Sequence, residues 1–132
     1  MKIIFVNGCF DVIHPGHIQL FEYAKSLGDY LIVAIDSDRK VAEMKGPDRP
    51  IFSQHDRAKV LSSIRYIDVI HTFDTKLELE NLIEAINPDI MVIGSDWKGK
   101  EVVGECYAKE VRFFDRVGDY STTRTIQGIT YR

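Results

Sequence analysis

The sequence has few cysteines, no excess of positive charge and no long apolar run. Its 132 residues include only Cys9 and Cys106, which cannot form a structural zinc site, and a chain of this length needs no disulfide. Lys and Arg total 17 against 20 Asp and Glu, which disfavours a nucleic-acid partner. Apolar runs such as 30–35 are far shorter than the roughly 20 residues that span a bilayer. With no secretory leader before the first predicted strand, we expect a cytoplasmic protein without a membrane partner.

Length and composition predict one domain, residues 1–132. Hydrophobic residues make up 45% of the chain and charged residues 28%, which is typical of a globular protein. A single domain commonly has 100 to 150 residues. The sequence contains no internal repeat, low-complexity tract or linker that would divide it.

Apolar segments with strand character alternate with segments of helical periodicity. Strands are predicted at 2–6, 30–35, 66–73, 89–94 and 111–114, and helices at 15–27, from 53 through 64, at 78–86 and at 121–129. A basic loop rich in Gly and Pro occupies 45–50. Strands that are apolar throughout predict an α/β fold, a Rossmann-like open parallel sheet with helices on both faces. In such sheets ligands bind beyond the carboxyl ends of the strands.

The connection between the first strand and its helix carries the strongest functional signal. Pro15 suits the first position of the helix, with His14 before it and His17 in the first turn. Because a following proline keeps His14 extended, the two imidazoles need not stack and can flank the helix N-terminus. Its free N–H groups and partial positive charge suit a phosphate, and Gly8 and Gly16 allow close approach. A lone histidine here would more often be a cap or a surface residue, but a pair around Pro-Gly favours a phosphate site.

At these residues the chain resembles the cytidylyltransferase-like nucleotidyltransferases. The family signature, Gly-x-Phe-Asp followed by His-x-Gly-His, is present as 8–11 and 14–17. In such enzymes an acceptor phosphate attacks the α-phosphorus of a nucleoside triphosphate, and pyrophosphate leaves. The resemblance implies that His14 and His17 hold phosphate oxygens as charge builds, while Lys45 and Arg116 neutralise the triphosphate. Further landmarks follow in the expected order: Lys45-Gly46, Arg49-Pro50, Arg57, Arg65 to Asp68, Gly94 to Trp97, and Ser121 to Thr123.

The resemblance also implies binding roles for two groups of residues. Expected nucleotide-binding residues are Gly8, Cys9, Phe10, Gly16, Asp96, Trp97, Ser121 and Thr122; expected acceptor-binding residues are Asp11, Asp38, Arg57 and Arg65. Ser121 and Thr122 could instead be plain helix caps, and the two arginines could be surface ion pairs. We expect Mg²⁺ or a similar divalent ion to bridge phosphate oxygens, although no carboxylate cluster identifies its ligands.

The substrate signals in the sequence are mixed. Segments 65–68 and 96–100 resemble glycerol-3-phosphate cytidylyltransferases, whereas 45–51 and 101–104 resemble the adenylyltransferase domain that activates heptose 1-phosphate. We favour CTP with glycerol 3-phosphate because the loop at 96–97 should lie nearest the base, and keep ATP with heptose 1-phosphate as the alternative. Gly118-Asp119-Tyr120 departs from the cytidylyl pattern.

Other classes of function are less well supported. A non-catalytic nucleotide-binding regulator remains possible, although every basic residue of the motif is present. The P-loop pattern at 94–100 is rejected because Glu101 stands where a metal-binding Ser or Thr is needed. Family members usually form homodimers, which we carry over as an expectation.

Overall fold

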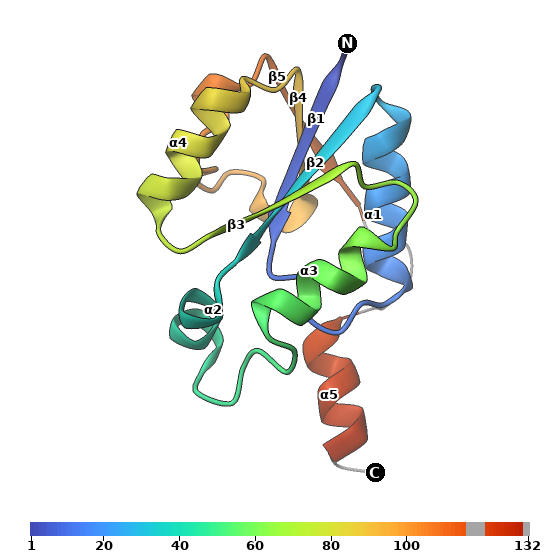
Figure 1. The fold of residues 1–132 in the computed structure, drawn as a ribbon, viewed down its shortest axis with the longest axis vertical. Helices are drawn as coiled ribbons and strands as arrows, with labels where there is room; N and C mark the ends of the chain where they lie inside the picture. The colour runs from blue at the N-terminus through green and yellow to red at the C-terminus, as the bar shows by residue number, and fades with distance from the viewer. Residues whose placement is uncertain (116–120, 131–132) are drawn as a thin grey trace.

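The structure is a computed structural model that describes residues 1–115 and 121–130, and it contains a parallel sheet in the order β3-β2-β1-β4-β5 (Figure 1). The strands are β1 (Ile3–Gly8), β2 (Tyr30–Asp36), β3 (Val69–Phe73), β4 (Ile90–Gly94) and β5 (Glu110–Phe114). The helices are α1 (Pro15–Ser26), α2 (Asp38–Lys45), α3 (Gln54–Ser62), α4 (Lys76–Ile86) and α5 (Thr122–Thr130), with short 3₁₀ turns η1 (Ser95–Trp97) and η2 (Glu105–Tyr107). The predicted Rossmann-like sheet is confirmed.

The central strands are buried on both faces, as their nearly continuous apolar sequences predict. Alternate residues of β1 point to opposite faces of the sheet. Ile4 and Val6 pack with α1 and α3, whereas Phe5 packs with α4 and Val102. Two apolar clusters therefore hold β1 between layers of helices and fix the position of its carboxyl end.

The edge strands are less apolar than the sequence analysis expected. In β3, His71 and Thr72 are exposed, and in β5 Glu110 and Arg112 are exposed. Each edge strand has a sheet neighbour on only one side, so part of its surface faces solvent. The prediction that every strand is apolar and covered throughout is wrong at both edges.

Helix starts follow their capping residues. Ser37, Ser53 and Thr75 are N-caps of α2, α3 and α4, each accepting a hydrogen bond from a backbone N–H within the first turn. Within residues 1–115 and 121–130, no helix is both long enough and apolar enough to cross a membrane.

The chain reverses its direction of sheet growth between β1 and β4. From β1 it adds β2 and then β3 on one side, and afterwards crosses to add β4 and β5 on the other. Such a reversal leaves a crevice at the carboxyl ends of the two central strands. The connection from β1 to α1, with its histidines, begins at this crevice.

Candidate functional site

A pocket of about 370 Å³ lies at the carboxyl ends of β1, β2 and β4. Several of the expected site residues line it together: Gly8, Cys9, Phe10, Lys45 and Trp97. Its other walls come from α2, the start of α4 and the loop after β4, and include Asp36, Lys40, Met44, Phe73, Leu79, Glu101, Val102 and Val103. The sequence analysis expected ligands at this edge of the sheet.

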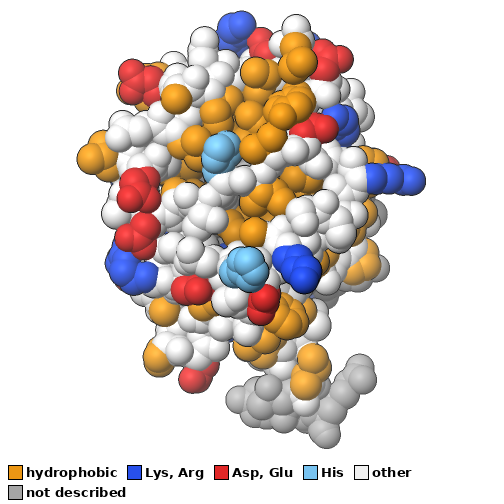
Figure 2. All heavy atoms as spheres, in the orientation of Figure 1, with side chains coloured by type: hydrophobic (Ala, Val, Ile, Leu, Met, Phe, Trp, Pro, Cys, Tyr) orange, Lys and Arg blue, Asp and Glu red, His pale blue; other side chains and the backbone are white. Residues whose placement is uncertain are grey.

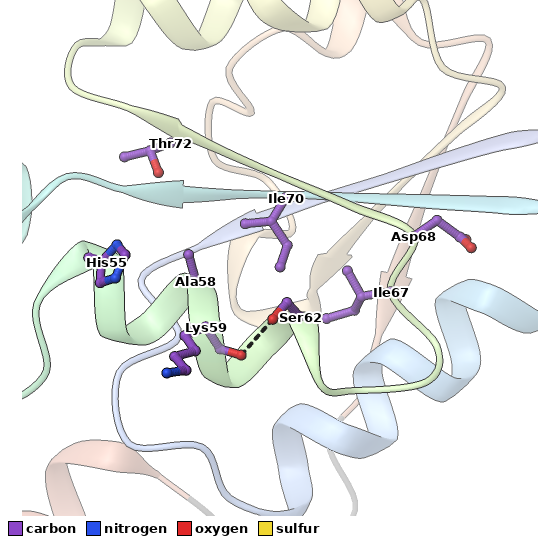
Figure 3. A pocket seen from close by; sticks show the side chains of 8 residues that line it. All are labelled: His55, Ala58, Lys59, Ser62, Ile67, Asp68, Ile70 and Thr72. Carbon is purple, nitrogen blue, oxygen red and sulfur yellow. Dashed lines mark hydrogen bonds between the residues drawn. The ribbon is translucent and has the colours of Figure 1, made fainter.

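A second, larger cavity of about 600 Å³ lies away from this site, on the outer side of α3 and β3 (Figure 3). Ala58, Ile67 and Ile70 line it among polar neighbours. None of its lining residues belongs to the expected active site. The smaller pocket is the one lined by residues 8–10 of the motif.

The two motif histidines are stacked on each other, which corrects the expectation that they would be separate. His14 is extended, with φ −131° and ψ 170°, as predicted for a residue before proline. Its ring nevertheless lies 3.7 Å from the ring of His17, centroid to centroid, with 24° between their planes. The stacking follows from capping, because each side chain turns back toward the backbone of the first helical turn.

These capping contacts also use the amides that were expected to bind phosphate. Nδ1 of His14 accepts the Gly16 N–H at 3.1 Å, and Nδ1 of His17 accepts the His14 N–H at 3.1 Å. The His17 N–H donates to the His14 carbonyl at 3.0 Å. A neutral imidazole whose Nδ1 is an acceptor carries its proton on Nε2. The Gly16 amide is therefore already engaged within the cap, and each ring carries its proton on Nε2.

The backbone before the histidines is strained and closely packed. Phe10 and Val12 have φ values of 49° and 50°, in the left-handed region that branched residues rarely adopt. A Cβ at Gly8 would lie 2.9 Å from the Phe10 ring, so this position requires glycine. The same ring contacts His17 edge-on at a centroid distance of 5.5 Å. Gly8 thus makes room for Phe10, which supports the histidine, rather than for a phosphate.

Asp11, an expected acceptor-binding residue, is buried and holds two backbone amides of the protein itself. The residue is 2% exposed, and its carboxylate accepts the N–H groups of Ile51 and Phe52 at 2.7 and 3.0 Å. Nε of Arg49 lies 3.4 Å from the same carboxylate. Asp11 therefore fastens the loop after α2 to the connection between β1 and α1.

Arg57 is also internal, and its guanidinium is engaged by groups of the protein itself. It is 1% exposed, and its guanidinium donates to the carbonyls of Cys9 and Phe52 and to the carboxylate of Asp38. Asp38 is half-exposed, but one of its oxygens accepts both this bond and the Gln54 N–H. Through these contacts Arg57 and Asp38 join α2 and α3 to the connection between β1 and α1.

Arg65 lies at the other end of the sheet. It follows α3 near the amino end of β3, and it donates to the hydroxyl of Tyr66, which in turn donates to Glu22 of α1. The pocket is at the carboxyl ends of the strands, so the structure does not bring Arg65 together with the expected site residues that line it.

The start of α5 is attached to the same connection. The Thr122 hydroxyl donates to the carbonyl of Asp11 at 2.7 Å, and the Ser121 hydroxyl accepts the Arg124 N–H at 3.4 Å. Thr122 thus positions α5, and Ser121 caps it, instead of presenting their hydroxyls to a phosphate in this structure. Arg116 and the departure at 118–120 lie outside the described residues.

Two expected residues face the opening of the pocket from separate segments. Lys45, in the last turn of α2, is exposed, and Trp97, in η1, is 52% exposed. The Lys100 ammonium lies 5.8 Å from the centre of the Trp97 ring. Asp96 is exposed beside Trp97 and does not line the pocket. An exposed indole at this rim can stack on a planar base.

The sequence analysis missed Asp36 and Lys40. Both line the pocket. The sequence pattern that could have identified them is an acidic residue at the end of the second apolar strand with a lysine four residues later, a spacing that allows an ion pair. Burial and the nearby Asp36 carboxylate raise the pKa of the Cys9 thiol to about 11, so this thiol stays protonated and donates to Asp36.

The donor set offers no protein cage for a divalent ion. Over the part of the chain that the structure describes, no three His, Cys, Asp or Glu side chains are grouped so as to hold a metal. The Asp11 carboxylate, the acidic group nearest the motif in sequence, is already occupied by amides. These residues fit a metal that arrives on phosphate oxygens, as Mg²⁺ commonly does.

Comparison with known proteins decides the family. Residues 5–127 match the family model described as Cytidylyltransferase-like. The chain belongs to the cytidylyltransferase-like family. Membership confirms the resemblance drawn from the motif and the nucleotidyltransferase class that it implied.

Curated relatives are similar over almost the whole chain. It is 49% identical to "Bifunctional protein HldE" of Campylobacter concisus over 97% of its length, and 48% identical to the protein of the same name from Nitratiruptor sp. over 96%. The chain spans 27% of the length of each of these relatives.

Solved structures share the fold at low identity. A lipopolysaccharide core biosynthesis protein from Thermoplasma volcanium has a TM-score of 0.68 and 23% identity, covering 92% of this chain and 99% of that one. A pantoate-beta-alanine ligase from Francisella tularensis has a TM-score of 0.64 and 17% identity, covering 96% of this chain and 65% of that one. At these identities the likeness concerns the fold alone.

Proposed function

We propose that this chain transfers a nucleoside monophosphate from a nucleoside triphosphate to the phosphate of a small hydroxylated acceptor, releasing pyrophosphate. The observation that carries the proposal is the capped histidine pair. Neither histidine lines the pocket at the β1–β4 crevice, but the ring of His17 contacts Phe10, which does. An oxygen of the acceptor phosphate forms a bond to the α-phosphorus. The bond from that phosphorus to the bridging oxygen breaks, and pyrophosphate leaves with the electron pair.

The chain's own residues supply position and positive potential for this step. Capping leaves the Nε2–H of His14 and of His17 as the donor of each ring, and stacking holds the rings at a fixed separation. Such preorganised donors stabilise charge that builds on phosphate oxygens in the transition state. Lys45 adds a cation at the pocket rim, and Arg116 is proposed to add another. No nucleophilic side chain is required. Mg²⁺ bound to the triphosphate would neutralise further charge.

ATP with a heptose 1-phosphate is the substrate pair that the observations favour. Segments 45–51 and 101–104 resemble the heptose 1-phosphate adenylyltransferase domain, and Lys45 and Glu101 to Val103 line the pocket. The two curated relatives above are both named HldE, and neither is named a cytidylyltransferase. CTP with glycerol 3-phosphate is the second candidate, favoured by the resemblance at 96–100 and by Trp97 at the rim.

A homodimer with β3 at its interface is the proposed assembly. β3 is an edge strand with one unpaired side, which favours association with another chain. The cavity of Figure 3 adjoins it, and Figure 2 shows apolar side chains gathered on this face. Light scattering should give the mass of two chains, and Ile67→Asp should give the mass of one. A monomeric wild-type chain would contradict the proposal. The cytoplasmic location likewise stays a prediction.

The reaction is tested by measuring pyrophosphate release with ATP, CTP, GTP and UTP, each paired with heptose 1-phosphate or glycerol 3-phosphate. Release should be highest with ATP and heptose 1-phosphate, and it should stop when EDTA removes divalent ions. Highest release with CTP and glycerol 3-phosphate would select the second candidate. No release with any pair would favour a nucleotide-binding regulator.

A further inference from the structure

Asp36 is a buried carboxylate in the pocket that the proposed reaction does not use. It ends β2, and it is 6% exposed. The Cys9 thiol donates to its Oδ2 at 3.4 Å, and Nζ of Lys40 lies 3.7 Å from its Oδ1. Lys40 is one helical turn beyond Asp36, with its ammonium also 3.7 Å from the sulfur of Met44.

The hydrogen bonding of this carboxylate is weak for a buried charge. An ionised carboxylate has about four acceptor positions, and a thiol is a poor donor. In the portion of the protein that the structure describes, no N–H or O–H group donates to its side chain within hydrogen-bond distance. Buried charges are normally satisfied by several donors. The remaining positions of Asp36 are therefore suited to donors brought by a ligand.

The surroundings indicate what kind of ligand brings them. Phe73, Leu79 and Val102 are buried apolar residues of the same pocket and suit the carbon skeleton of a small molecule. A carboxylate repels phosphate but accepts hydrogen bonds from hydroxyl groups. Lys40 lies at the Asp36 carboxylate, whereas Lys45, further along α2, places positive charge elsewhere on the pocket wall. A molecule with a phosphate at one end and hydroxyl groups at the other matches this distribution.

The geometry points to Asp36 as the specificity-determining residue for the acceptor: its carboxylate accepts hydrogen bonds from acceptor hydroxyl groups, and Lys40 holds that carboxylate in position. This inference rests on the proposed function and deepens it. The phosphate end of the acceptor then lies away from Asp36, toward the histidines and Lys45. Selection by Asp36 favours polyhydroxylated acceptors over simple alkyl phosphates, because a buried acceptor group left without its donor is costly.

Trp97 provides a binding measurement that does not depend on turnover. It is the only tryptophan in the chain, and it lines the pocket. Titration of its fluorescence with heptose 1-phosphate, and with the monodeoxy forms of that sugar phosphate, gives a Kd for each. We expect the wild-type protein to bind at least one deoxy form about tenfold or more weakly than the parent compound. Equal affinity for the parent and every deoxy form, or no binding of the parent, would overturn the inference.

The variant Asp36→Asn keeps the size of the side chain and removes its charge. It should weaken binding of heptose 1-phosphate about tenfold or more and reduce discrimination against the deoxy forms to within about threefold. The affinity for ATP alone should stay within about twofold. Glu43→Gln is the matched control, because it removes a carboxylate from α2 that is 69% exposed and outside the pocket. Lys40→Met should also weaken acceptor binding, by a smaller factor, while discrimination persists.

Two results separate the inference from the proposed function. Absence of pyrophosphate release with every pair, together with the expected fluorescence titrations, would reject the transfer reaction and retain the hydroxyl-binding role. Turnover by the wild-type protein with unchanged discrimination in Asp36→Asn would reject the role of Asp36 and retain the reaction. If Asp36→Asn fails to fold, the wild-type series of deoxy compounds still decides the question.

Discussion

The backbone N–H of His14 donates to Nδ1 of His17 at 3.1 Å, so the second histidine of the motif holds the first at the helix start. The reciprocal contact, from Gly16 to Nδ1 of His14, completes a capping box in which imidazoles replace the usual hydroxyl and carboxylate. In each histidine, Nδ1 therefore accepts a capping hydrogen bond, and Nε2 is the ring nitrogen proposed to donate to phosphate oxygens.

Variants of His17 can remove the Nε2 donor while keeping an acceptor for the capping hydrogen bond. Asparagine at this position keeps an acceptor for the His14 N–H but has no Nε2 donor. We expect His17→Asn to retain the melting temperature within a few degrees while kcat falls roughly 100-fold to 1000-fold. His17→Ala should lose both the activity and part of the stability. Activity of His17→Asn within a few fold of wild type would contradict a role for Nε2.

Arg57 and Arg65 should differ in what they stabilise. Removing the buried Arg57 leaves two carbonyls and a carboxylate without their donor, so Arg57→Ala should lower the free energy of unfolding by about 3 to 5 kcal/mol. The exposed Arg65→Ala should change it by less than about 0.5 kcal/mol. Urea titration measures both values. An increased KM for the acceptor in Arg65→Ala would support the acceptor role expected from the sequence.

The two cysteines should react at different rates with iodoacetamide. Burial, followed by the Asp36 carboxylate, raises the pKa of Cys9 to about 11, whereas Cys106 is exposed. At pH 9, half of a thiol with the ordinary pKa of 9.0 is ionised, but only about 1% of a thiol with a pKa of about 11 is thiolate. Mass spectrometry of the alkylated protein should show Cys106 labelled first and Cys9 labelled only as the pH approaches 11. Labelling of Cys9 as fast as Cys106 at pH 8 would show that its surroundings are more open.

Asp68 should contribute to stability at neutral pH but not in strong acid. Burial acts to raise the pKa of Asp68, but hydrogen bonds from the Lys25 ammonium and the Leu31 N–H outweigh it and lower the pKa below its ordinary value. A lowered folded-state pKa stabilises the fold above the unfolded value of 3.8 and loses that effect as the pH falls through the folded value.

The matching measurement is denaturation of Asp68→Asn across pH. The variant should be less stable than wild type by about 1 kcal/mol at pH 7, since the ion pair is partly exposed, and the difference should shrink below about pH 4. Asp48→Asn, in the exposed loop after α2, serves as the control and should show no such dependence. A constant difference at all pH values would mean that Asp68 acts through packing rather than charge.

The sequence was sufficient to predict the sheet but not the inward or outward direction of charged side chains. Apolar runs such as 30–35 identify buried strands because few other segments can be surrounded by helices. The helix α2 was not predicted because Val41 is its only buried residue, which leaves little apolar periodicity. Arg57 looked like a surface cation because its contact with the Cys9 carbonyl joins residues 48 positions apart, and no local pattern reports such a contact.

Contacts between residues far apart in the sequence also explain why only part of the site could be located from the sequence. The motif at 8–17 is contiguous, so its residues and their helix start could be located from sequence. Asp11 and Asp36 both come at the ends of apolar segments. The Asp11 carboxylate accepts two backbone N–H groups, whereas Asp36 lines the pocket. Only the three-dimensional path of the loop at 49–52 distinguishes them.

Asp11 joins segments of the site that are far apart in the sequence. Its carboxylate secures Ile51 and Phe52, while its carbonyl secures Thr122, which lies 111 residues away in the chain. The loop after β4 is tied instead to α4, through Lys76 and Glu101. The loop after β4 can therefore change in sequence without disturbing the contacts by which Asp11 holds the loop at 51–52 and the start of α5.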